Sequence, residues 1–136
     1  MTSETPARPQ PYDGFYDRPF WEHAARYELR LPRCTGCGSY VWPAAPVCDA
    51  CLSPDLEWTA VSGKGKLLSW VVFHRQYFPG IPTPYNCILV ELDEGPLFIS
   101  NLVGLENDAI DFDLRLEVDF LDLAEGYTLP VFRAAG

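Results

Sequence analysis

Apolar and polar positions alternate with a period of two over much of the second half of the chain. Residues 114–122 (LRLEVDFLD) show this most clearly, because every second side chain from Leu114 to Phe120 is apolar. β-Branched and aromatic residues are also concentrated in runs that Gly, Pro, Asp and Glu interrupt. Such runs predict strands, here over residues 66–77, 85–92, 97–103, 114–122 and 128–133.

Five predicted strands, with a longer connection between the third and the fourth, match the small Greek-key barrel called the OB fold. A generic five-stranded sandwich is the alternative. With 136 residues and 48% hydrophobic side chains, the chain is long and apolar enough to bury one core. The sequence therefore predicts a mainly β protein with its barrel over residues 63–136.

The first third of the chain follows a different pattern. Three prolines and few apolar groups indicate a flexible tail over residues 1–14. Behind Pro19, which suits a first helical turn, apolar side chains recur every three to four residues. This spacing predicts a short helix over residues 18–27, within an N-terminal helical segment that covers residues 15–31.

Four of the five cysteines form two Cys-x-x-Cys pairs that ten residues separate. Together they supply four thiolates, which make a complete tetrahedral set for Zn²⁺. Gly36 and Gly38 allow the tight turns through which amide N–H groups point at ligand sulfurs. We expect a rubredoxin-like zinc ribbon over residues 32–62, with one structural Zn²⁺ bound by Cys34, Cys37, Cys48 and Cys51.

A filled Cys₄ set leaves no coordination position for water or substrate, so the site is structural and not catalytic. The alternatives are two disulfides, an iron site of the rubredoxin type, or free buried thiols. A reducing compartment disfavours disulfides, whereas four sulfurs do not by themselves exclude iron. The fifth cysteine, Cys87, lies in the middle of a predicted strand, and we interpret it as a small hydrophobe and not as a nucleophile.

Charge narrows the function classes. The chain carries 10 Lys and Arg against 19 Asp and Glu, which gives a net charge of −9. An acidic surface repels phosphate backbones and anionic lipid head groups, so nucleic-acid and membrane partners are disfavoured. The sequence has no apolar run of transmembrane length and no signal-peptide pattern at its N-terminus. We therefore expect a cytoplasmic protein with reduced thiols.

Residues for acid–base or nucleophilic chemistry are scarce. The chain has two histidines, and it has no phosphate-binding glycine loop and no nucleophile elbow. A candidate groove for an anionic, partly apolar ligand flanks the proline-rich loop and would contain His74, Arg75, Tyr77, Phe78 and Tyr85. The alternative is that these aromatic rings pack the barrel and the charges are solvated.

Six aromatic side chains lie within sixteen residues, from Tyr12 to Tyr27. A domain of this size has little capacity to bury all of them, and clustered exposed aromatics mark protein interfaces. The candidate partner-binding residues are therefore Phe15, Tyr16, Phe20, Trp21 and Tyr27. The alternative is that the helix packs on its own barrel.

The order of these parts resembles the DUF35 family, whose members combine a zinc ribbon with an OB fold. An aromatic helix (RPFWEHAARYELRLPRC) leads into the two cysteine pairs, and GKGKLLSWVVFH, PGIPTPY, ILVELDEGPLFISNLVG, LEVDF and PVFR follow in that order. The resemblance covers residues 15–134. Many zinc ribbons share the cysteine pairs, but the combination with the helix and the VELDEG turn is more specific.

The resemblance implies an accessory role in acyl-CoA metabolism. DUF35 proteins are typically encoded and assembled with thiolase-like enzymes, including thiolases, acyl-CoA aldolases of steroid side-chain degradation and hydroxymethylglutaryl-CoA synthases. The implied role is a non-catalytic subunit that supports such a partner and helps to position an acyl-CoA thioester. We expect a complex with two copies of each chain, in which the four cysteines correspond to the family's metal ligands.

Two other classes of function stay open at this point. One is a nucleic-acid-binding OB protein with a zinc ribbon, which the negative charge disfavours. The other is a small stand-alone acyl-CoA enzyme, such as a thioesterase or a hydratase, which the lack of an acid–base constellation disfavours.

Overall fold

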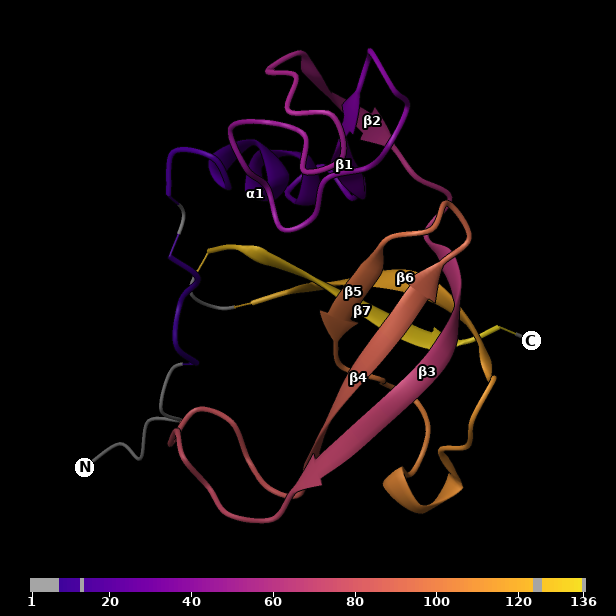
Figure 1. Ribbon diagram of the computed structural model, residues 1–136. Coiled ribbons are helices and arrows are strands. Elements are labelled where there is room, and N and C mark those ends of the chain that lie inside the picture. The colour runs from indigo at the N-terminus through magenta and orange to yellow at the C-terminus, as the bar shows by residue number, and fades with distance from the viewer. Residues whose placement is uncertain (1–7, 13, 124–125, 136) are drawn as a thin grey trace.

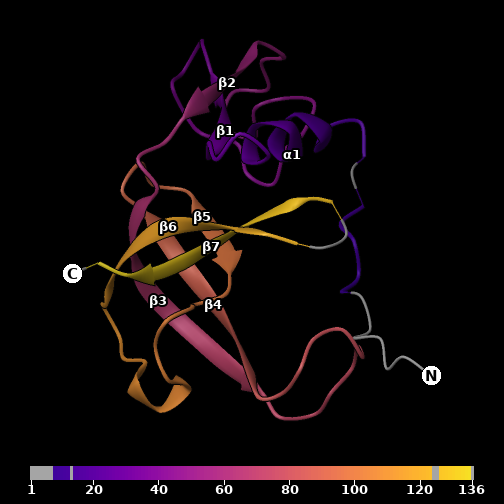
Figure 2. The same cartoon turned by 180° about the vertical axis from the view of Figure 1, so that it is seen from behind.

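The computed structural model describes residues 8–12, 14–123 and 126–135. A short helix, α1 (Arg18–Ala24), and a two-stranded sheet of β1 (Arg30–Cys34) and β2 (Leu56–Ala60) form a small cysteine module. Both views show that this module covers one end of a curled five-stranded sheet (Figures 1 and 2). Most of the tail predicted over residues 1–14 lies outside the described residues.

The larger sheet has the strand order β5-β4-β3-β6-β7, and all hydrogen-bonded neighbours run antiparallel. Its strands are β3 (Lys64–Phe73), β4 (Tyr85–Leu92), β5 (Leu97–Ser100), β6 (Arg115–Asp122) and β7 (Thr128–Ala134). A 3₁₀ turn (Asn107–Ala109) lies in the long connection between β5 and β6.

The sheet curls until its two edges meet. Just after β5, Leu102 forms a parallel bridge with Phe132 of β7. The N–H of Phe132 donates to the carbonyl of Asn101 at 3.0 Å, and the N–H of Val103 donates to the carbonyl of Phe132 at 2.8 Å. These parallel contacts between the end of β5 and β7 close the five strands in the manner of an OB fold, which confirms the predicted barrel.

The strands fall close to their predicted positions, and β4 coincides with the prediction. The helix is shorter than expected, because the chain turns at Tyr27, whose φ is 62°. There the N–H of Tyr27 donates to the carbonyl of Ala24, and the N–H of Glu28 donates to the carbonyl of His23. This is a Schellman motif, with a tyrosine where glycine is usual.

One hydrophobic core joins the cysteine module to the barrel. The ring of Phe20 from α1 lies 4.7 Å from the ring of Trp42, and the ring of Trp42 lies 5.5 Å from that of Phe98 on β5. Leu31 of β1 is fully buried in the same cluster. Leu29, just before β1, joins this cluster, and the remaining core side chains come from the barrel strands and the connection after β5: Leu67, Ile88, Val90, Leu92, Leu102, Ile110, Leu116 and Phe132.

The start of β3 yields a test of the barrel. Gly63 has a φ of +75°, and a Cβ added there would collide with the side chain of Val118. Gly104 has a φ of +76°, but an added Cβ there would meet no atom within 4 Å. Gly63→Ala should lower the free energy of unfolding by about 2 to 4 kcal/mol, because steric overlap adds to left-handed strain.

Gly104→Ala is the matched control. It should cost about 1 kcal/mol, since only the backbone strain applies there. Denaturant unfolding of both variants measures the difference. Equal losses for the two variants would show that the contact between Gly63 and β6 does not constrain the barrel.

Candidate metal centre and docking surface

The two cysteine pairs adopt the same backbone turn. In the first pair, the N–H of Gly38 donates to the carbonyl of Cys34 at 2.9 Å; in the second, the N–H of Leu52 donates to the carbonyl of Cys48 at 2.8 Å. Gly38 and Leu52 both have positive φ, 81° and 65°. The structure therefore repeats one knuckle twice, and the second knuckle tolerates a leucine in the left-handed position.

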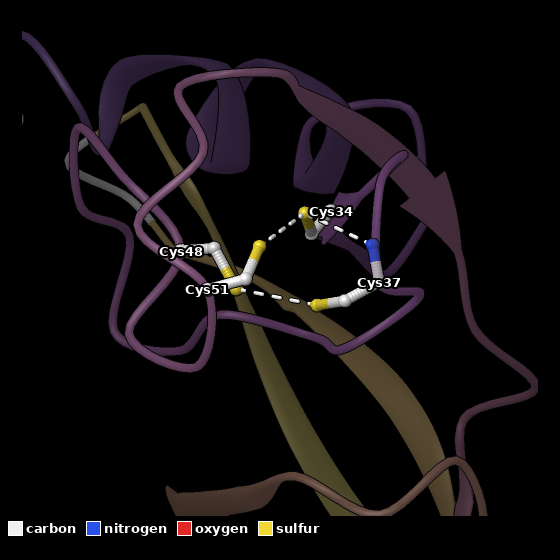
Figure 3. A group of neighbouring side chains, drawn as sticks. All are labelled: Cys34, Cys37, Cys48 and Cys51. Atoms are coloured by element: carbon white, nitrogen blue, oxygen red, sulfur yellow. Dashed lines mark hydrogen bonds between the residues drawn. The ribbon is translucent and has the colours of Figure 1, made fainter.

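All four sulfurs converge on one point between the knuckles (Figure 3). The Sγ atoms of Cys34 and Cys51 lie 3.5 Å apart, those of Cys37 and Cys48 lie 3.6 Å apart, and all four lie within 4.8 Å of one another. A tetrahedral Zn²⁺ with bonds of about 2.3 Å places its sulfurs roughly 3.8 Å apart. These separations fit a metal centre and are far longer than a disulfide bond of about 2.05 Å.

Backbone amides support the sulfurs as ligands. The N–H of Cys37 donates to the Sγ of Cys34 at 3.5 Å, and the N–H of Ala50 donates to the Sγ of Cys48 at 3.4 Å. Such hydrogen bonds stabilise the thiolate form that metal binding needs. Cys34 and Cys48 are also buried, and Val41 packs beside them.

The four thiols compete for ionisation when no cation balances them. Hydrogen bonds from the Ser39 hydroxyl and amide lower the pKa of Cys37 to about 6. The pKa of Cys51 is raised to about 12: the Ser53 amide favours its thiolate, but hydrogen bonds with Cys34 and Cys37 oppose it. A soft divalent cation removes this conflict, because it favours the thiolate at every position.

The structure corrects the expected docking surface at Phe20. Its side chain is 4% exposed, and its ring packs against those of Trp42 and Phe98, so it belongs to the core. The alternative that the helix packs on its own barrel therefore holds for this residue. Sequence periodicity placed Phe20 on an apolar stripe but did not show what that stripe faces.

The other aromatics of the segment divide into two groups. Trp21 is partly buried, with its ring edge-on to Tyr127 at 5.7 Å, and the hydroxyl of Tyr27 donates to Asp122 at 2.6 Å. Tyr27 is nevertheless 56% exposed. Phe15 and Tyr16 are also exposed, at 81% and 48%. These two rings line a hollow of about 340 Å³ that extends to Pro19, Pro32, Leu56 and Trp58, which we call the α1 groove.

The residues of the candidate ligand groove lie beside the end of β3, where the rings of Tyr77 and Tyr85 both contact that of Phe73. His74, Arg75, Tyr77 and Phe78 lie exposed on the connection after β3. Tyr85 also lines a hollow of about 500 Å³. Its polar lining includes Asn86, Asn101 and Asn107, and we call it the asparagine hollow.

Sequence reasoning missed these asparagines. The buried side chain of Asn86 accepts from the N–H of Leu102 at 2.7 Å and donates to the carbonyl of Leu102 at 2.9 Å and to Asn107 at 3.0 Å. Asn86 occupies an inward position of β4, in register with Ile88, Val90 and Leu92. The sequence did contain a signal for this site, because Asn86 is a polar residue at a position of the strand where the other inward-facing residues are apolar.

Cys87 behaves as the sequence predicted. Its side chain is half-buried, and burial raises the pKa of its thiol. A raised pKa favours the protonated and unreactive form.

In the part of the chain that the structure describes, no helix is both long and apolar enough to cross a membrane.

Geometry and sequence together define a protein with a structural Cys₄ zinc ribbon and an OB fold. The model of the rubredoxin-like zinc ribbon domain of ChsH2 matches residues 21–57, and the model of the C-terminal OB-fold domain of ChsH2 matches residues 58–121. The cofactor of the Cys₄ site is accordingly one structural zinc ion.

Curated relatives and a solved structure give the family. A DUF35 domain-containing scaffold protein of Pyrococcus furiosus is 30% identical over 73% of this chain and 74% of its own length. A chain of the solved Ltp2-ChsH2(DUF35) aldolase superposes with a TM-score of 0.88 at 33% identity, over 93% of this chain and all of that one. The chain belongs to the DUF35 family.

Some relatives are much longer. A probable enoyl-CoA hydratase alpha subunit of Thermomonospora curvata is 37% identical over 88% of this chain. The match covers 38% of that relative's length. The matched part of the chain thus corresponds to just under two fifths of the larger protein.

Removal of one ligand tests the metal centre. The native protein should contain about one Zn²⁺ per chain, and Cys48→Ser should lose the metal and the fold of residues 30–60, because metal binding here is also folding free energy. Elemental analysis and thermal unfolding measure both effects. Cys87→Ser, which removes a cysteine outside the cluster, should keep the zinc. Iron in the native protein, or full zinc content in Cys48→Ser, would contradict the assignment.

Proposed function

We propose that this chain is a non-catalytic accessory subunit of a thiolase-like enzyme, either a thiolase or an acyl-CoA aldolase. The observation that carries the proposal is the match over 93% of the chain to the DUF35 component of the Ltp2-ChsH2(DUF35) aldolase. The proposed assembly contains two copies of each chain. A cytoplasmic location fits a metal centre that needs four reduced cysteines.

The chemistry of the described residues favours an accessory role over a catalytic one. The Cys₄ set fills every position of a tetrahedral metal. Cys87 is held as a thiol. The asparagine hollow has three amides, Arg8 and one carboxylate, Glu106, and its described lining has no histidine, cysteine or second carboxylate to form an acid–base pair with Glu106. The catalytic groups of the proposed complex would then belong to the partner.

An acyl-CoA thioester is the small molecule that we propose for the complex. Arg75 lies exposed on the connection after β3 and offers positive charge to phosphates in an otherwise acidic protein, and the neighbouring His74 is exposed beside it. Tyr85 lies where that connection meets the asparagine hollow, whose amides match the amide groups of a pantetheine arm. In this proposal the chain helps the partner to position the thioester.

The α1 groove is the first contact that we propose for the partner. Phe15 and Tyr16 are exposed, and their rings meet edge-on at 5.2 Å. Exposed aromatic anchors carry much of the affinity at protein interfaces. Trp21 and Tyr27 contribute at the border of this surface, whereas Phe20 supports it from the core.

Recovery of the native complex tests the proposed function. The tagged chain, expressed at its native level in its own cells, should co-purify with a thiolase-fold protein identified by mass spectrometry, and native mass analysis should give two copies of each chain. The chain alone should not turn over acyl-CoA substrates. Recovery without a thiolase-fold protein, or turnover that follows the isolated chain, would refute the proposal.

Substitutions in the α1 groove sharpen this test. Phe15→Ser combined with Tyr16→Ser should weaken binding to the recovered partner by about 2 kcal/mol or more if these rings are anchors. Phe112→Ser is the matched control, since Phe112 is also largely exposed but lies in the connection between β5 and β6, at the opposite end of the barrel from α1 (Figure 1). Equal binding by both variants would remove the α1 groove from the interface.

A further inference from the structure

The outer face of β3, β4 and β5 is apolar where a solvated sheet face is usually polar. Val71 of β3 pairs with Cys87 of β4, and Leu89 of β4 pairs with Ile99 of β5. Ile99 is 69% exposed and Val71 is 54% exposed. We call the surface made by Val71, Cys87, Leu89, Leu97 and Ile99 the β4–β5 face.

The β4–β5 face is hollowed on both sides of Ile99. One hollow of about 220 Å³ lies over the strands and is lined by Val71, Cys87, Leu89 and Ile99. A second, of about 260 Å³, shares Cys87 and Ile99 and extends to Trp21 of α1. The apolar surface is therefore continuous from the sheet to the aromatic segment that precedes the cysteine module.

Charge indicates what kind of surface covers this face. None of its five side chains carries a charge at neutral pH, although the whole chain has a net charge of −9. A second copy of the chain would bring another −9, and this repulsion disfavours self-association. An uncharged apolar surface on a protein of different charge balance is the better match.

The size of a stable interface indicates that the partner proposed for the α1 groove also covers the β4–β5 face. A stable protein interface uses about 800 Å² and 20 to 30 residues on each partner. The two exposed rings of the α1 groove are too few for this. The hollow beside Ile99 reaches Trp21 of α1, and the same helix carries Pro19 and Glu22, which line the α1 groove. Contiguous apolar patches on soluble proteins usually mark binding sites.

We propose that the β4–β5 face docks the thiolase-fold partner, which projects uncharged apolar side chains into the two hollows beside Ile99. This inference rests on the proposed function and adds a second contact region to it. The face and the α1 groove then form one interface, with Ile99 near its centre and the polar pair of Lys66 and Glu91 at one end.

Lysine substitutions on the face test the inference. Ile99→Lys and Val71→Lys should each weaken binding to the recovered thiolase-fold partner at least tenfold, because each buries an unpaired charge in the interface. Ile99→Leu should keep binding close to that of the wild type. Leu52→Lys is the matched control: Leu52 is 73% exposed but lies in the second cysteine knuckle, and it should bind within twofold of the wild type.

Folding and partner identity are controlled separately. The thermal unfolding temperature should be similar for all variants, since the substituted side chains are exposed. If either lysine variant unfolds, Ile99→Thr replaces it and should bind the partner about fivefold more weakly than the wild type does. A wild-type chain that recovers no thiolase-fold protein refutes the proposed function together with this inference. Wild-type binding with unchanged binding by Ile99→Lys refutes this inference alone. A wild-type dimer that Ile99→Lys disperses would assign the face to a second copy and overturn it.

Discussion

The cluster of aromatic rings formed by Phe20, Trp42 and Phe98 is the contact that joins three different parts of the chain. Phe20 comes from the helix, Trp42 from the segment between the two cysteine knuckles, and Phe98 from the shortest barrel strand. The ring of Phe98 continues the contact to Phe132 on β7, beside the parallel contacts that close the barrel. Leu29 and Leu31 extend the same core from the cysteine module toward the barrel.

The same three rings connect the metal centre to the proposed docking surface. Trp42 lies between Cys37 and Cys48, so the four zinc–sulfur bonds fix the segment that carries its ring. Trp42, Phe20 and Phe98 also line the hollow between Trp21 and Ile99. A structural zinc can therefore shape the proposed docking surface, although that surface contains no zinc ligand.

Local signals in the sequence predicted much of this fold. The cysteine ligands follow from spacing alone, and β4 follows from a run of strand-forming residues between clear turn residues. The end of α1 was missed, because its Schellman motif uses Tyr27 in place of the glycine that marks such ends. Tyr27 is held there from a distance, by Asp122 and the ring of Phe120 on β6.

Features that depend on contacts between residues far apart in the chain could not be predicted from the sequence. Phe20 was expected on a surface, but its partner Phe98 is far along the chain, and no local pattern reveals that contact. The β4–β5 face was missed for a related reason. The run YNCILVEL is apolar at both inward and outward positions, so alternation could not show that Cys87 and Leu89 face outward.

Hydrogen exchange with and without zinc tests most directly whether the metal centre and the docking surface are one structural unit. Removal of the metal should accelerate exchange in β5 at least tenfold together with residues 30–60, because the Trp42 ring no longer supports Phe98. The pairing of Phe73 with Tyr85, at the other end of β3 and β4, should stay protected. Faster exchange confined to residues 30–60, with β5 unchanged, would contradict the account.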